Sequence, residues 1–109
     1  MSLSARSFHP VAAGDGVTRQ VLADSSELMI VANDFEAGAR GALHHHPHLQ
    51  ATFVHSGRFS FTVAGETFEV GPGDCFIVPP DAEHGCECLE AGRLVDSFTP
   101  RRDDFLAEQ

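Results

Sequence analysis

The sequence predicts an all-β protein in which short antiparallel strands form a sandwich or barrel. Turn-forming residues recur at short intervals, and the segments between them are rich in β-branched and aromatic residues. The segment from Phe59 to Val63 alternates apolar and polar residues with a period of two, which is typical of a half-buried strand. Many short strands at this spacing favour an antiparallel sandwich or barrel.

Clusters of glycine, proline, aspartate and serine delimit the expected strands in order along the chain. Asp24-Ser25-Ser26 separates the first two strands, and Ala64-Gly65-Glu66 separates two later ones. The tail at residues 101–109 is the one segment expected to form a helical turn or two. The expected strands are residues 17–22, 28–35, 51–55, 59–63, 67–70, 75–78, 85–89 and 94–98.

Length and composition predict one globular domain. A chain of 109 residues can bury one core but not two, so we expect a single domain over residues 1–109. The longest apolar run, residues 28–32, is far below the roughly 20 residues that span a bilayer, which argues against a membrane partner. Residues 1–16 contain one arginine and no apolar stretch of signal-peptide length, so we expect a cytoplasmic protein.

The charged residues exclude several functions. A formal charge of −9 argues against nucleic acid as a partner, because binding to phosphate backbones needs a basic face. All seven cationic side chains are arginines, and the chain has no lysine, tyrosine or tryptophan. Schiff-base chemistry, P-loop phosphate binding and a tyrosine acid or base are therefore excluded. The three cysteines lack an exported context and are expected to be reduced thiols.

Four histidines and a glutamine occur within LHHHPHLQ, residues 43–50. On a strand, alternate side chains share a face, so His44, His46 and His48 would point one way. Pro47 should end that strand near His48, and Gln50 would open the next strand. Two histidines and an amide oxygen could then converge on one point. The alternative for this segment alone is a solvated loop with coincidental histidines.

Two spaced motifs favour a metal site. HxHxxxQxxxxxxG covers residues 44–57, and GxxxxxPxDxxH covers residues 73–84. Together they resemble the two motifs of the cupin superfamily, here spread over residues 41–88. Gln50 stands where most cupins have glutamate, Asp81 where they have glycine, and Cys88 where they have asparagine. The resemblance implies a single antiparallel β-barrel of jelly-roll topology with metal ligands inside, and a homodimer.

The ligands implied by the resemblance are His44, His46, Gln50 and His84. They would hold a divalent ion such as zinc, nickel, iron or manganese. Because all four donors are neutral, the ion would keep its +2 charge and suit a Lewis acid that binds an anionic or hydroxylated substrate. The alternatives are that Gln50 faces solvent at a strand start and that His84 is a capped turn histidine.

A narrower resemblance adds three candidate catalytic residues. HxHPHxQ at residues 44–50 and DSFTPxRxDF at residues 96–105 are similar to small single-domain cupins of pectin and alginate catabolism, which linearise 4,5-unsaturated uronates. Leu49 departs from that pattern, where an acidic residue is frequent. The resemblance implies that Asp96, Phe98 and Arg102 act beside the metal on a small anionic sugar acid.

The chemistry of these residues agrees with that assignment. Ring opening and tautomerisation move a proton while charge develops on oxygen. Asp96 shares a strand face with apolar neighbours, so burial would raise its pKa and suit it to acid or base catalysis. Arg102 could bind a carboxylate bidentately. The alternatives are an outward-facing Asp96, a plain core role for Phe98 and a solvated Arg102. Cys86 and Cys88 could line the pocket near the metal or serve as small hydrophobes.

Three functions remain open from the sequence. The first, which we favour, is a metal-dependent enzyme that isomerises unsaturated uronates by ring opening. The second is a non-haem iron dioxygenase, because four neutral ligands leave two positions open on an octahedral iron. The third is a non-catalytic module that binds a sugar or a small acid.

Overall fold

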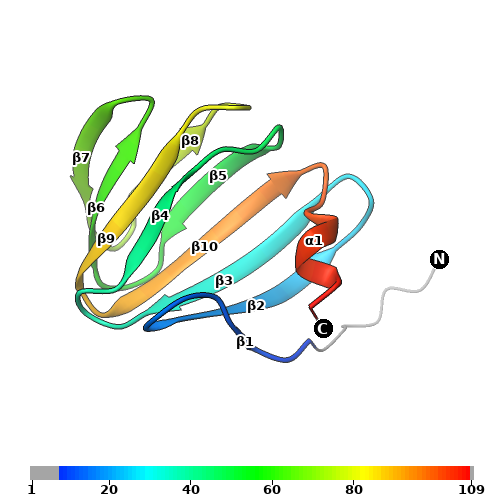
Figure 1. Ribbon diagram of the computed structural model, residues 1–109, viewed down its shortest axis with the longest axis horizontal. Helices are drawn as coiled ribbons and strands as arrows, with labels where there is room; N and C mark the ends of the chain where they lie inside the picture. The colour runs from blue at the N-terminus through cyan, green and yellow to red at the C-terminus, as the bar shows by residue number, and fades with distance from the viewer. Residues whose placement is uncertain (1–7, 109) are drawn as a thin grey trace.

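The structure, a computed structural model, describes residues 8–108, so residues 1–7 and 109 of the expected domain lie outside it. Two antiparallel sheets face each other, with a short helix near the C-terminus (Figure 1). The elements are β1 Val11–Ala12, β2 Val17–Asp24, β3 Met29–Phe35, β4 Arg40–His44, β5 Leu49–Val54, β6 Arg58–Val63, β7 Glu66–Val70, β8 Cys75–Val78, β9 His84–Glu90, β10 Gly92–Thr99 and α1 Asp103–Leu106.

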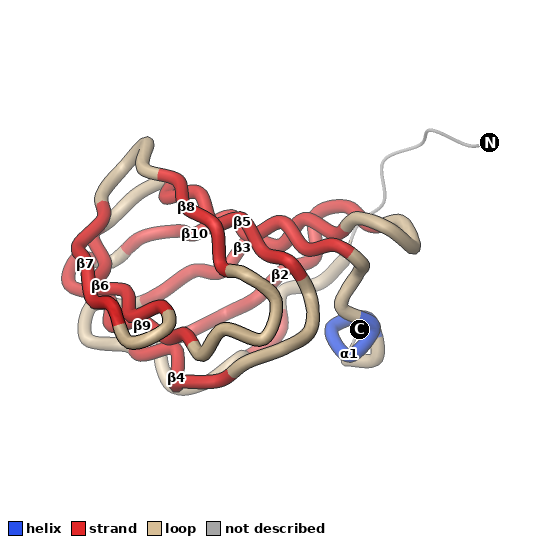
Figure 2. Tube along the Cα trace, turned by 90° about the horizontal axis from the view of Figure 1, so that it is seen from above, coloured by secondary structure: helices blue, strands red, loops and turns tan. Residues whose placement is uncertain are grey.

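The chain alternates between the two sheets as a jelly roll does. One sheet has six strands in the order β1-β2-β3-β10-β5-β8, and the other has four in the order β4-β9-β6-β7. Seen from above, the two sheets enclose a common interior, and α1 lies at one end of it (Figure 2). The predicted all-β antiparallel class is confirmed. In the described part of the chain, no helix is long and apolar enough to cross a membrane.

The predicted strands agree closely with the observed ones. All eight are present, with ends shifted by at most two residues, and α1 is the helical turn expected in the tail. Strand β1 was not predicted, because its two residues give no periodic pattern. Strand β4 shows no alternation either, since four of its five residues are exposed.

The core lies between the inner faces of the two sheets. Phe59 and Phe61 of β6 are buried there, while Ser60 and Thr62 are more exposed, so the alternation predicted for this strand is confirmed. The ring of Phe59 packs edge-to-face on Phe35 from the other sheet, with ring centroids 5.3 Å apart. A second apolar cluster lies toward α1 and consists of Val21, Met29, Val31, Phe98 and Phe105.

Gly57, the last residue of the first motif, is required by close packing. Its φ angle is +81°, a conformation that residues with a Cβ rarely adopt. A Cβ atom there would lie 2.5 Å from the carbonyl oxygen of Glu90 and 2.7 Å from the Cα atom of Gly92. The turn from β5 to β6 can therefore pass against the turn from β9 to β10 only with glycine at this position.

We predict that Phe59→Ala lowers the free energy of unfolding by about 3–5 kcal/mol, because it removes a fully buried ring and leaves a cavity. The matched control Ser60→Ala, one position along the strand, should change it by less than about 0.5 kcal/mol. Urea denaturation followed by circular dichroism measures both. Equal losses in the two variants would contradict the assigned strand register.

Candidate metal centre

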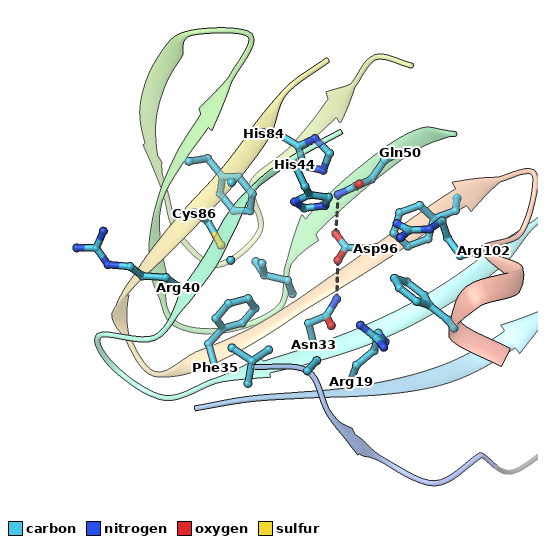
Figure 3. A pocket seen from close by; sticks show the side chains of 18 residues that line it. Arg19, Asn33, Phe35, Arg40, His44, Gln50, His84, Cys86, Asp96 and Arg102 are labelled. Atoms are coloured by element: carbon cyan, nitrogen blue, oxygen red, sulfur yellow. Dashed lines mark hydrogen bonds between the residues drawn. The ribbon is translucent and has the colours of Figure 1, made fainter. Parts of the chain in front are cut away.

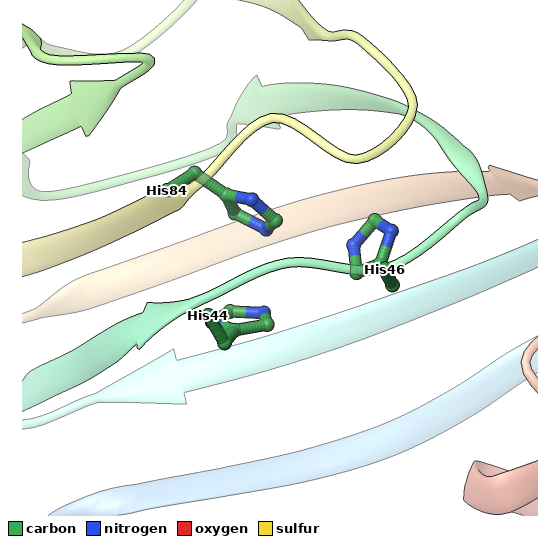
Figure 4. Close-up of side chains that lie close together, drawn as sticks. All are labelled: His44, His46 and His84. Carbon is green, nitrogen blue, oxygen red and sulfur yellow. The ribbon is translucent and has the colours of Figure 1, made fainter.

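Three histidines from different parts of the chain meet at one end of the interior (Figure 4). His44 ends β4 and His84 begins β9, and the antiparallel register places these two residues directly opposite each other. His46 follows β4 in a loop. The ring centroids of His44 and His84 are 4.2 Å apart, those of His46 and His84 4.9 Å. One ligand atom from each ring lies within 4.8 Å of the others.

The expectation that one strand carries His44, His46 and His48 and ends near His48 is wrong. Strand β4 ends at His44, and residues 45–48 form a loop. The physical reason is Pro47, which lacks a backbone N–H and restricts the residue before it. The loop is held by a hydrogen bond from the Asp81 backbone N–H to the His46 carbonyl, 2.8 Å long. Asp81, where cupins have glycine, adopts a φ angle of +64°.

Each of the three rings is oriented by its Nδ1 atom. This atom lies within hydrogen-bond distance of a backbone carbonyl two residues away, at 2.8 Å for His44 and His84 and 3.2 Å for His46. A carbonyl can only accept, so the hydrogen bond places the proton on Nδ1 and the lone pair on Nε2. Metal-binding histidines are typically oriented in this way.

Gln50 lies beside these histidines at the start of β5 and is buried, not solvent-facing. Its amide nitrogen donates to the Thr52 hydroxyl at 2.9 Å and lies 3.4 Å from Asp96 Oδ1. The amide oxygen therefore faces the histidines, 2.9 Å from Nε2 of His46. Adjacent ligands with metal bonds of about 2.1 Å are separated by about 3 Å, so this distance suits two donors to one ion.

Burial keeps two of the imidazoles neutral. His84 is 3% exposed, and burial lowers its pKa from 6.5 to about 4, against the opposing effect of its backbone hydrogen bond. Burial also lowers the pKa of His46. Nε2 of His84 is buried and, within residues 8–108, has no hydrogen-bond partner. A buried acceptor without a partner is costly, and a bound divalent ion would satisfy it. The donor set fits such an ion.

A buried carboxylate adjoins this centre (Figure 3). Asp96 on β10 accepts hydrogen bonds from the Thr52 hydroxyl at 2.6 Å and from the Asn33 amide at 2.7 Å. Burial raises the pKa of Asp96, although these hydrogen bonds and the Gln50 amide act in the opposite direction. The outward-facing alternative for Asp96 is therefore wrong.

A cavity of about 140 Å³ connects these groups, and the side chains that line it are drawn in Figure 3. His44, Gln50, His84 and Asp96 lie at its polar end. The cavity lies between the two sheets, so strands far apart in the sequence supply its walls. It offers a ligand simultaneous access to the histidine cluster and to the buried carboxylate.

Phe98 and Arg102 also line the cavity. Phe98 belongs to the apolar cluster, yet its ring also packs edge-to-face on His46, with centroids 5.6 Å apart. The Arg102 side chain is 12% exposed and stacks over Phe105 at 4.2 Å, so it is not a solvated residue. Its guanidinium donates two hydrogen bonds to the carboxylate of Asp104, at 3.1 and 3.0 Å.

The two cysteines of β9 differ in their surroundings. Cys86 lines the cavity, and burial raises the pKa of its thiol to about 11, so the thiol stays protonated near neutral pH. Cys88 is part of the apolar core. Its thiol donates a hydrogen bond to the Glu90 carbonyl, 3.1 Å away. Cys88 is thus the small hydrophobe that the sequence allowed for.

Sequence reasoning missed Asn33, Thr52 and Arg19, all of which face the interior. A signal was present, because each occupies a position in phase with buried apolar residues of its strand. Asn33 stands between Val31 and Phe35, and Arg19 stands between Val17 and Val21. A polar residue at an inward position of an otherwise apolar strand indicates a buried polar contact.

The model of the cupin domain family matches residues 33–98, and the chain belongs to this family. The chain is 38% identical over 95 residues to the pectin degradation protein KdgF of Dickeya dadantii, covering 85% of this chain and 86% of that protein. It also matches the structure of KdgF from Halomonas sp., with 35% identity, a TM-score of 0.86 and coverage of 90% and 91%. An RmlC-like cupin from Shewanella frigidimarina matches with 40% identity, a TM-score of 0.86 and coverage of 89% and 87%.

We predict that the double variant His46→Ala, His84→Ala loses its bound divalent metal. Wild-type protein should retain about one ion per chain after dialysis, because one ligand atom from each of the three histidines lies within 4.8 Å of the others. The control is His45→Ala, which removes an exposed histidine from the same loop. Elemental analysis by mass spectrometry gives the stoichiometry. Full metal content in the double variant would refute the assignment.

The lowered pKa of His84 predicts a pH dependence of stability in metal-free protein. Between pH 6.5 and about 4 the unfolded chain binds a proton that the folded chain does not, so stability falls as pH falls through this window. The loss attributable to His84 should approach about 3 kcal/mol at the acid end. Urea titrations with a chelator present should show a smaller loss for His84→Gln, and the same loss as wild type for His45→Gln. An equally large loss in His84→Gln would contradict the assigned burial.

Proposed function

We propose that this protein is a metal-dependent isomerase that opens the ring of 4,5-unsaturated uronates released from pectin or alginate. The observation that carries the proposal is the direct contact between Gln50, a candidate metal ligand, and Asp96, a buried acid–base group, beside one cavity. The similarity to two KdgF proteins, one of them named for pectin degradation, supports the substrate class.

The metal ligands in this proposal are His44, His46, Gln50 and His84. When bound, a divalent ion such as zinc, nickel, iron or manganese supplies a Lewis acid that polarises substrate oxygens. The four side chains would contribute neutral donors, and a bound ion would be reachable from the cavity, which His44, Gln50 and His84 line. His44 is exposed, which keeps one side of the centre open to an entering ligand.

Asp96 carries the proton. Ring opening removes the proton from the anomeric hydroxyl, its electrons form the C1 carbonyl, and the bond from C1 to the ring oxygen breaks. The ring oxygen leaves C1 as an enolate oxygen on C5, and this enolate becomes a ketone when the proton taken from the anomeric hydroxyl is added to C4, so the overall change is an isomerisation without a co-reactant. Asp96 can accept the first proton and return it. Cys86 stays protonated, and the histidines are committed to the metal, so Asp96 is the proton carrier among the described cavity residues.

Arg102 and Phe98 position the substrate in this proposal. Arg102 uses one part of its guanidinium for Asp104, and its remaining donors are available to a substrate carboxylate in the cavity. Phe98 gives the sugar ring an apolar surface next to His46. The dioxygenase alternative requires molecular oxygen as a co-substrate, whereas ring opening proceeds equally well under nitrogen.

We also propose that residues 1–109 form one cupin domain whose substrate is a small anionic sugar acid. The described strands from β2 to β10 contribute to two sheets around one interior, as a single domain requires. The homodimer and the cytoplasmic location expected from the sequence stay predictions.

We predict that Asp96→Asn retains its metal and its fold but loses turnover by about 10²–10⁴-fold, because a positioned acid–base group typically contributes that much. Arg102→Ala should instead raise KM with a smaller effect on kcat, since it anchors substrate without moving a proton. The assay follows the loss of alkene absorbance of an unsaturated galacturonate against its uncatalysed decay, under air and under nitrogen.

Three outcomes of this assay would count against parts of the proposal. Metal-loaded wild-type protein that does not exceed the uncatalysed rate refutes the uronate function. Turnover that stops under nitrogen favours the dioxygenase instead. Asp96→Asn protein as fast as wild type removes Asp96 from the mechanism and leaves the enzyme assignment intact.

A further inference from the structure

Arg19 lies on β2 of the six-stranded sheet, and its side chain faces the interior between the two sheets. It is in phase with the buried Val17 and Val21 on β2, and the register places it opposite Asn33 on β3. Its side chain is 14% exposed and lines the cavity. Figure 3 shows Arg19 on the far side of Asp96 from His44 and His84. A permanently charged side chain at a buried position needs partners.

The partners of Arg19 leave one donor unused. Its guanidinium stacks over the ring of Phe105 at 3.9 Å and pairs with the carboxylate of Glu108. Its Nε atom is buried and has no hydrogen-bond partner within the described chain. Arg102 stacks over the same Phe105 ring at 4.2 Å. Two guanidiniums therefore share one aromatic ring at the wall of the cavity, and Arg19 keeps an unsatisfied donor.

The wall of the cavity beside Phe105 is rich in guanidinium groups, although the protein as a whole is acidic. The chain carries a formal charge of −9. Among the described residues that line the cavity, however, Arg19 and Arg102 outnumber the one carboxylate, that of Asp96, while Arg40 is largely exposed and pairs with Glu87 outside it. A concentration of guanidiniums in a partly enclosed, low-dielectric space favours an anionic ligand. Both arginines beside Phe105 are neutralised by carboxylates of the C-terminal segment, Asp104 for Arg102 and Glu108 for Arg19.

We propose that Arg19 and Arg102 together bind the carboxylate of the ligand, and that Glu108 occupies Arg19 until the ligand displaces it. The proposal rests on the function above for the identity of the ligand as a uronate. A carboxylate has two oxygens that each accept two hydrogen bonds, so it can bind two guanidiniums at once. The Glu108 side chain is 48% exposed, and an ion pair with so exposed a partner is weak and easily exchanged.

Equilibrium binding tests this proposal with D-galacturonate, a saturated uronate that cannot react, and with D-galactose, which has the same ring without the carboxylate. Calorimetry uses the metal-loaded protein. Arg19→Gln should weaken galacturonate binding by about 10- to 100-fold, the range of a lost charge-assisted hydrogen bond, and leave galactose binding unchanged. Arg19→Lys should recover part of the loss, because it keeps the charge without the planar fork.

The second variant, Glu108→Gln, gives an effect in the opposite direction. It removes the competing carboxylate and should tighten galacturonate binding by about two- to fivefold. The matched control is Asp103→Asn, which removes one negative charge from the same segment but pairs with Arg101 outside the cavity. Galacturonate binding to Asp103→Asn should equal that of wild type.

Several results would overturn the proposal. One is Arg19→Gln protein that binds galacturonate as tightly as wild type, and another is an equal loss of galacturonate and galactose, which indicates a packing role. Glu108→Gln protein with unchanged or weaker binding overturns the displacement step. If wild-type protein turns over unsaturated uronate and Arg19→Gln has the same KM as wild type, the role of Arg19 is refuted and the proposed function is not. If galacturonate binding depends on Arg19 but the protein does not turn over unsaturated uronate, the carboxylate-binding role of Arg19 is supported and only the proposed function is refuted.

Discussion

The side-chain amide of Gln50 joins the two chemical parts of the site. Its oxygen faces the histidines, and its nitrogen faces Thr52 and Asp96. An amide can serve both sides because it has one accepting end and one donating end. A glutamate here, as most cupins have, would present an oxygen to Asp96 Oδ1 at about the same separation. Two carboxylates in contact cannot both ionise easily, and the pKa of one would rise strongly. Glutamine thus allows a buried Asp96 to lie against the candidate metal centre.

Gln50, Thr52 and Asp96 form a hydrogen-bonded network whose geometry is fixed by its position in the sheet. Thr52 is opposite Asp96 in the ladder between β5 and β10, and Gln50 is opposite Phe98 in the same ladder. Both strands are internal to the six-stranded sheet, so their backbone hydrogen bonds fix the register on both sides. Buried polar groups stabilise one conformation only when every member is satisfied. The Asn33 amide, which comes from the next strand, completes the shell of Asp96.

The sequence predicted what depends on local pattern and left out what depends on distant partners. Period-two alternation found the strands, and two spaced motifs identified the histidines that the structure brings together. Alternation failed where Pro47 ends the regular backbone, although His46 still reaches the cluster from the loop. Asn33 went unnoticed because its partner Asp96 is 63 residues away. A polar residue in an apolar pattern shows that a partner exists, but only strand order identifies that partner.

The C-terminal segment places an aromatic ring and two carboxylates against the arginines of the cavity. Phe105 of α1 packs on Phe98 in the apolar cluster, which fixes the segment to the core. That ring offers a flat surface to guanidiniums, which are weakly hydrated and stack well, whereas an ammonium would keep its water. A guanidinium that stacks on a ring keeps the N–H donors at its edge available for hydrogen bonds. All cationic side chains of the protein are arginines. This suits a buried position, because a buried lysine would lose its proton readily while a buried arginine stays charged. In the proposed function, neutral metal ligands with permanent positive charge beside them would discriminate an acid from a neutral sugar.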